Sequence, residues 1–309
     1  MIYRFILILT FISVLFSACN NSSEQKNVEE LDINSFEVPD SLLEEDAALE
    51  LDKETMGEII QNISSPVEMS ALLKDENIAF NYKFLSPTDN VDEFNTSFKQ
   101  ALNLGVLGAD MGYLNIYNKT GAVINYITAI KELSDELKVG QFFNFETLKR
   151  LATNSENIDS LMYMSISAFD KMEVYLRENN RSNISALLVT GVWMEGIYLA
   201  TQVVKENDNE TIRERVAEQG IVLEQLLMVL SHYKTNQQFF TLITELEKVN
   251  LALSKVTIIE EEGEAEMQEI DGVLTVVSNT TTTIEMTDEQ LEEIIATVEE
   301  ARAFVIKYN

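Results

Sequence analysis

Apolar residues recur at helical spacing along most of this chain, from about residue 64 to its end. They return every three to four positions, in blocks that are separated by Asn, Asp, Gly and Ser. The three prolines all lie at or before Pro87, so no proline interrupts a later block. Gly140 is expected to end the second of the long helices. The blocks predict these helices over residues 92–116, 120–138, 145–153, 156–179, 182–206, 209–232 and 235–256.

The pattern changes after Ile258. Residues 260–264 form a charged run that we expect to be solvated, and residues 272–277 are rich in β-branched side chains. Ser278-Asn279 is typical of a turn, so the sequence predicts a small hairpin over 272–286. Thr287-Asp288-Glu289-Gln290 is a capping box that opens a C-terminal helix over 287–308. We therefore expect a mainly all-α fold over residues 63–309, a multi-helix bundle of about eight to nine helices with a small β-hairpin before the last helix.

The amino terminus predicts export and lipidation. Arg4 precedes an apolar run from Phe5 to Phe16, which is too short to span a bilayer and is typical of a signal peptide. The following Leu15-Phe16-Ser17-Ala18-Cys19 resembles the lipobox of bacterial lipoproteins, although an aliphatic residue is usual where Phe16 stands. The resemblance implies a signal peptide over 1–18 and acylation of Cys19. An ordinary signal peptide that is cleaved nearby, with Cys19 uninvolved, is the alternative.

The same resemblance predicts where the protein resides. Lipoproteins of this type carry several acyl chains such as palmitate, and more than one chain anchors a protein stably to a membrane. Asn20 stands where an aspartate often retains such proteins at the inner membrane, so the outer membrane is favoured. Residues 19–62 are polar and acidic and are expected to form a tether. The leaflet that the protein faces is left open.

Charge and residue types exclude several functions. The chain has 22 Lys and Arg against 52 Asp and Glu, a net charge of −30, and this balance argues against nucleic-acid binding. Cys19 is the only cysteine and His232 the only histidine, so thiolate or histidine metal sites and histidine-based triads are not expected. We expect no catalytic residues, no metal and no cofactor, and we interpret the chain as non-enzymatic.

Two acidic residues stand out within apolar helices. Residues 186–200 contain one charge, Glu195, and fifteen residues are too few to span a membrane, so this segment is expected to be a buried central helix. Asp110 lies in a similar setting. Tyr113 and Tyr198 follow the two acids by three positions, about one helical turn, and are candidate hydrogen-bond donors. A lone buried carboxylate is too costly to persist, so each acid must be neutral, paired or solvated.

Three interpretations of this constellation remain open. Asp110, Tyr113, Glu195 and Tyr198 are either a structural polar core, with Arg150 and Arg181 as candidate cations, or a pocket for a small molecule or cation. Acid–base chemistry by the two carboxylates is a third interpretation. On the opposite face from Asp110, a stripe of small residues predicts very close contact with another helix. The stripe consists of Ala101, Gly105, Gly108 and Gly112.

A resemblance in the predicted helical domain, like the lipobox, indicates a bacterial lipoprotein. The runs 95–98, 103–110 and 191–199, together with Ser65-Pro66, are similar to an uncharacterised family of all-helical bacterial envelope lipoproteins. No activity follows from that likeness. The leading hypothesis is a membrane-anchored, non-enzymatic protein that binds or scaffolds an envelope protein partner. The alternative is a lipoprotein that binds a small molecule or cation through Asp110 and Glu195.

Overall fold

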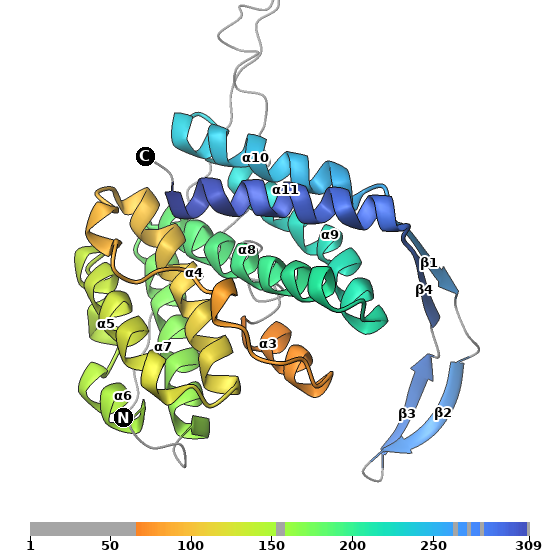
Figure 1. Cartoon of the computed structure of the whole chain (residues 1–309), viewed down its shortest axis with the longest axis horizontal. Coiled ribbons are helices and arrows are strands. Elements are labelled where there is room, and N and C mark those ends of the chain that lie inside the picture. Colours follow the sequence, from red (N-terminus) through yellow and green to blue (C-terminus); the bar gives the residue numbers. More distant parts are fainter. Residues whose placement is uncertain (1–65, 153–157, 262–264, 271–272, 279–280, 308–309) are drawn as a thin grey trace, which may run out of the picture. The chain divides into compact units, whose positions relative to one another are not determined.

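The computed structural model describes residues 66–152, 158–261, 265–270, 273–278 and 281–307, which all belong to one compact unit. The expectations for the signal peptide, Cys19 and the tether lie outside these residues. Within them the fold is mainly helical, as predicted (Figure 1). Its nine α-helices are α3 (Pro66–Asp75), α4 (Ser97–Ile116), α5 (Thr120–Glu136), α6 (Phe145–Ala152), α7 (Ile158–Glu178), α8 (Ser182–Glu206), α9 (Glu210–Ser231), α10 (Gln237–Leu253) and α11 (Asp288–Lys307).

Helix α8 is the centre of the bundle. It packs against α3, α4, α7, α9 and α11 (Figure 1), and most of its residues are buried. Among the described residues it is the one helix long and apolar enough to cross a membrane, but 89% of its apolar window is buried inside the protein. Its apolar surface is therefore covered by other helices, as expected for residues 186–200.

Helices α4 and α8 approach each other at two glycines. A Cβ atom added to Gly105 would lie 2.1 Å from the carbonyl oxygen of Leu188, and one added to Gly191 would lie 1.9 Å from that of Leu102. No side chain fits at either position, so glycine is required for the backbones to meet. The predicted close contact of the small-residue stripe is confirmed at Gly105. The next member, Gly108, faces the ring of Phe169 on α7 instead.

The helix ends follow local capping rules, with two corrections to the predicted bounds. Helix α4 begins at Ser97 and not at residue 92, because the hydroxyl oxygen of Thr96 accepts a hydrogen bond from the Lys99 amide and caps the helix there. At the end of α5 the left-handed residue is Lys138, with a φ of 58°, and not Gly140. The Val139 amide donates to the Ser134 carbonyl at 2.8 Å, which completes a Schellman motif around Lys138.

The β structure before α11 is larger than the predicted hairpin. Strand β1 (Thr257–Glu261) pairs antiparallel with β4 (Thr281–Glu285), and β2 (Ala265–Ile270) pairs with β3 (Val273–Ser278). The chain thus runs out along β1 and β2 and returns along β3 and β4, so β3 pairs with β2 and not, across the predicted turn at Ser278-Asn279, with β4. Part of the expected charged run, residues 260–261, belongs to β1.

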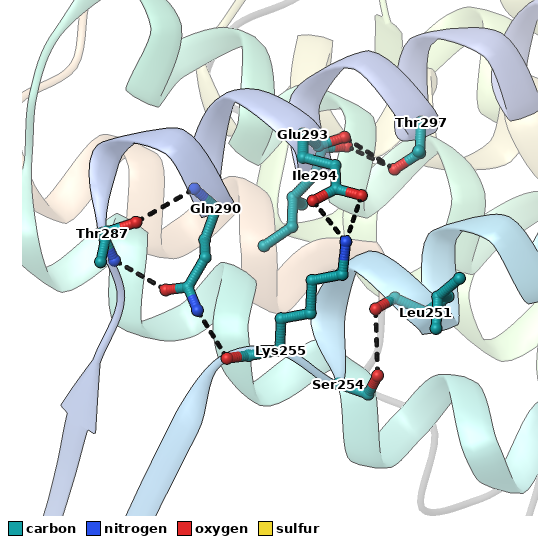
Figure 2. Close-up of polar contacts among 8 residues, drawn as sticks. All are labelled: Leu251, Ser254, Lys255, Thr287, Gln290, Glu293, Ile294 and Thr297. Carbon is teal, nitrogen blue, oxygen red and sulfur yellow. Dashed lines mark hydrogen bonds and ion pairs between the residues drawn. The ribbon is translucent and has the colours of Figure 1, made fainter.

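A set of polar contacts holds the root of this ribbon to the helices (Figure 2). The Thr287 amide donates to Oε1 of Gln290 at 2.8 Å and the Gln290 amide to Oγ1 of Thr287 at 3.3 Å, so the predicted capping box is confirmed. Gln290 Nε2 also donates to the Lys255 carbonyl at 2.6 Å. Lys255 Nζ in turn contacts both carboxylate oxygens of Glu293. These bonds tie the end of α10 to the start of α11.

Candidate functional site

The two acids that the sequence singles out meet in one buried cluster. Asp110 of α4 and Glu195 of α8 each have 0% exposure, and their charges interact. Arg302 of α11, which is 7% exposed, lies against both. We refer to Asp110, Glu195, Arg302 and Ser86 as the core cluster. It joins three helices and the loop that follows the 3₁₀ turn Tyr82–Phe84.

Glu195 and Arg302 form a bidentate ion pair. Nε of Arg302 donates to Oε2 of Glu195 at 2.7 Å, and Nη2 donates to Oε1 at 2.7 Å. Nη2 also donates to Ser86 Oγ at 2.7 Å and to the Phe84 carbonyl at 3.2 Å. Burial alone would lower the pKa of Arg302, but the charge and hydrogen bonds of Glu195 raise it above its usual value. The guanidinium therefore stays charged in the interior.

Asp110 completes the cluster, and its surroundings favour the protonated form of the acid. Its Oδ2 accepts a hydrogen bond from the Ser86 amide at 2.9 Å, whereas Oδ1 has no donor among the described residues. Burial first, and then the charge of Glu195, raise the pKa of Asp110 well above its ordinary value of 3.8. A proton on Asp110 leaves one negative and one positive charge in the cluster, on Glu195 and Arg302. The three ionisable groups then carry no net charge.

Ser86 connects the cluster to a fourth helix. Its amide contacts Asp110, its hydroxyl accepts from Arg302, and its carbonyl accepts a 2.6 Å hydrogen bond from Tyr126 OH on α5. All three polar groups of this buried serine are used. Burial raises the pKa of Tyr126 further above neutral pH, which is consistent with its hydroxyl acting as the donor.

The two tyrosines expected as donors to the acids have other roles. The hydroxyl of Tyr113 accepts a hydrogen bond from the Asn81 amide at 3.1 Å, and the ring stacks on Phe80. The ring of Tyr198 lies under the guanidinium of Arg302, with 3.8 Å between the guanidinium carbon and the ring centroid. Tyr198 therefore contacts the core cluster through the π face of its ring, whereas the hydroxyl of Tyr113 is bonded outside the cluster.

The cation is not one of the two that the sequence suggested. Arg150 lies on α6 and Arg181 precedes α8, and neither pairs with Glu195. The available signal for Arg302 was its position in α11, where it lies on the stripe of buried residues between Ala301 and Val305. A positive charge on the buried face of an amphipathic helix predicts a buried acidic partner. Ser86 and Tyr126 carried no comparable signal.

The chemistry of this cluster is that of a closed structural contact. Both oxygens of Glu195 are engaged by Arg302, so a cation would have to displace the guanidinium. Among the described residues, no group of three or more His, Cys, Asp or Glu side chains is placed to hold a metal ion. The geometry supports the interpretation of a structural polar core more than either a pocket or a pair of catalytic acids.

A pocket lies elsewhere, between the start of α9 and the end of β4. Its volume is about 390 Å³. Arg213 in its wall donates from Nη1 to Asp208 at 3.0 Å and to Asp288 at 2.9 Å, and from Nη2 to the Met286 carbonyl at 3.1 Å. The full lining consists of Asp208, Glu210, Arg213, Glu214, Ile284 and Met286.

Comparisons with known proteins give one partial likeness. No family model matches the chain, and no solved structure matches it. A segment of 96 residues is 31% identical to argininosuccinate lyase from Prochlorococcus marinus (strain MIT 9215). The match covers 30% of this chain and 20% of the lyase, so the chain spans about a fifth of that enzyme's length. A likeness of this extent places the chain in no family.

Proposed function

We propose that this protein is a lipid-anchored, non-enzymatic protein of the bacterial cell envelope that binds or scaffolds an envelope protein partner. One observation carries the proposal: the only cysteine of the chain, Cys19, directly follows an apolar export signal and a small residue. Acyl chains on Cys19 attach the helical domain to the membrane through residues 20–62. The outer membrane is favoured over the inner by Asn20.

The buried cluster supports a structural role for the acids within this proposal. Arg302 engages both oxygens of Glu195, and the Ser86 amide holds one oxygen of Asp110. A catalytic or ligand-binding carboxylate needs access to its substrate, whereas these two have 0% exposure. A binding or scaffold protein needs no such access, because it acts through its surface.

Lipidation is tested by labelling cells with radioactive palmitate. The wild-type protein should incorporate the label and sediment with membranes, and a Cys19→Ala variant should do neither. Ser17→Ala is the matched control, because a small residue is retained near the cleavage site and labelling should persist. Label that survives in Cys19→Ala, or a mature chain recovered without lipid mass, would contradict the anchor. Cross-linking in intact membranes, followed by purification, tests for the partner.

One observation favours a second candidate, the binding of a cation or small molecule at Asp110 and Glu195. Oδ1 of Asp110 has no hydrogen-bond partner among the described residues, so a ligand group would find an unused polar oxygen there. A thermal-shift screen of the full chain against divalent cations and metabolites tests this candidate. Stabilisation of the wild type that disappears in Asp110→Asn would support it. A ligand that stabilises both proteins equally, or no stabilising ligand, would count against it.

A further inference from the structure

Strand β4 offers a free backbone edge next to the pocket at the start of α9. Its residues pair with β1 along one edge, and no strand pairs with the other edge in the part of the chain that the structure describes. Ile284 of β4 and the adjacent Met286 form an apolar wall of the 390 Å³ pocket. We call β4 and this pocket the β4 edge site. It combines unpaired main-chain groups with a place for one long side chain.

The charge of the β4 edge site is strongly negative. Arg213 already contacts two carboxylates, and its pKa is raised, first by the hydrogen bond with Asp208 and then by that with Asp288. Within the described chain neither Glu210 nor Glu214 forms an ion pair, and both are exposed. In the sequence, residues 257–285 contain eight acidic residues and no Lys or Arg. The uncompensated carboxylates of the pocket therefore adjoin a strand segment without any positive charge.

We propose that the β4 edge site binds an extended, Lys- or Arg-rich segment of a partner protein, which adds to β4 as a further strand. This inference rests on the proposed function, since it names the surface that the partner would use. Main-chain hydrogen bonds to β4 supply affinity and side-chain pockets supply specificity in such complexes. The aliphatic stem of a Lys or Arg packs against Ile284 and Met286, and its charged end reaches Glu210 and Glu214.

Physical arguments favour this occupant over two others. An isolated two-stranded ribbon is marginally stable in water, and a third strand stabilises it. A second copy of the chain would bring one acidic ribbon against another, and like charges across an interface are unfavourable. Anionic lipid head groups are repelled in the same way. A basic polypeptide can form hydrogen bonds with the unpaired main-chain groups of β4 and can also neutralise the nearby carboxylates.

The test uses the full-length lipoprotein in detergent and a labelled eight-residue peptide of alternating Lys and Val, with fluorescence anisotropy as the readout. The double variant Glu210→Gln/Glu214→Gln should weaken binding by roughly five- to thirtyfold, as expected for the loss of two exposed ion pairs. The matched control is Glu224→Gln/Glu247→Gln, which removes two exposed acids from α9 and α10 and should change binding by less than about twofold. A peptide of the same sequence with every backbone nitrogen methylated should not bind. Hydrogen exchange should slow at residues 281–285 on binding.

Several results would overturn the proposal. Equal weakening in the two double variants would mean diffuse attraction to an acidic protein, and binding of the methylated peptide would exclude strand addition. Absence of peptide binding would mean that the acidic edge serves only to prevent strand pairing between copies. A dimer that blocks the peptide would mean that the edge directs pairing between copies. Failure of the anchor is a separate result, because peptide binding by a Cys19→Ala protein does not depend on lipid.

Discussion

Two carboxylate–cation contacts in this protein have nearly the same length and very different surroundings. Arg302 lies 2.7 Å from Glu195, and their side chains are 9% and 0% exposed. Lys255 lies 2.6 Å from Glu293 at the root of the ribbon, where the side chains are 44% and 43% exposed. Removing one partner of a buried pair leaves an uncompensated charge without water, whereas an exposed charge is solvated again. Burial, and not distance, decides what each contact contributes.

The largest expected effect comes from breaking the buried pair. Arg302→Met leaves Glu195 buried without its cation and should lower the free energy of unfolding by about 3–5 kcal/mol. Chemical denaturation of the full-length protein measures this change. In the double variant Glu195→Gln/Arg302→Met the unpaired charge is gone, so much of the stability should return. Equal losses in the single and double variants would show that the charge is not the cause.

The next largest effect on stability is expected where α4 and α8 approach each other at Gly191. Gly191→Ala forces a methyl group against the Leu102 carbonyl and should destabilise the protein by about 1–3 kcal/mol or more. Gly196→Ala is the matched control on the same helix, because nothing lies within 4 Å of its added Cβ. That control should be neutral or stabilising by up to about 1 kcal/mol, since alanine favours the helix. Equal melting temperatures for the two variants would contradict the close approach of α4 and α8.

The pH dependence of stability sharpens the contrast, because burial and the charge of Glu195 raise the pKa of Asp110 in the core cluster. The folded-state pKa of Asp110 is raised, so its contribution to stability is complete below its unfolded value near 3.8. That contribution decreases as the pH rises towards the folded-state pKa. Asp110→Asn mimics the protonated acid and removes this dependence. Wild type should therefore lose stability relative to Asp110→Asn by up to about 1.4 kcal/mol per pH unit.

Urea denaturation of both proteins between pH 4 and 9 measures that difference. Taking the difference between the two proteins cancels contributions from groups that do not interact with Asp110. A constant difference across this range would mean that Asp110 is ionised in the folded protein.

The smallest effect is expected at the ribbon root. Lys255→Met should change the free energy of unfolding by about 0–1 kcal/mol, because the pair is exposed to water and salt. Denaturation at low and high salt should show the difference decreasing as salt rises. A loss as large as that of Arg302→Met would remove the distinction between the two contacts.

Much of the fold followed from the sequence alone. Helix positions depend on periodicity and helix ends on caps, which are local, so the predicted helices lie close to the observed ones and the capping box at Thr287 is confirmed. Asp110 and Glu195 were found as candidates because a charge is conspicuous within an apolar helix. Local rules also misled at the end of α5, where Gly140 is the better left-handed residue but the chain places Lys138 in that conformation.

Partnership between distant residues was decided only by the tertiary structure. Arg302 is 107 positions from Glu195 in the sequence. Nothing in either local sequence specifies that Arg302 of α11 lies against Asp110 of α4 and Glu195 of α8. The amide, hydroxyl and carbonyl of Ser86 all form hydrogen bonds, although Ser86 lies in a loop without a sequence motif. The pairing of β1 with β4 likewise depends on contacts across the ribbon. The sequence determined which residues need partners, because burying polar groups is costly. The packing of the helices determined which partners they receive.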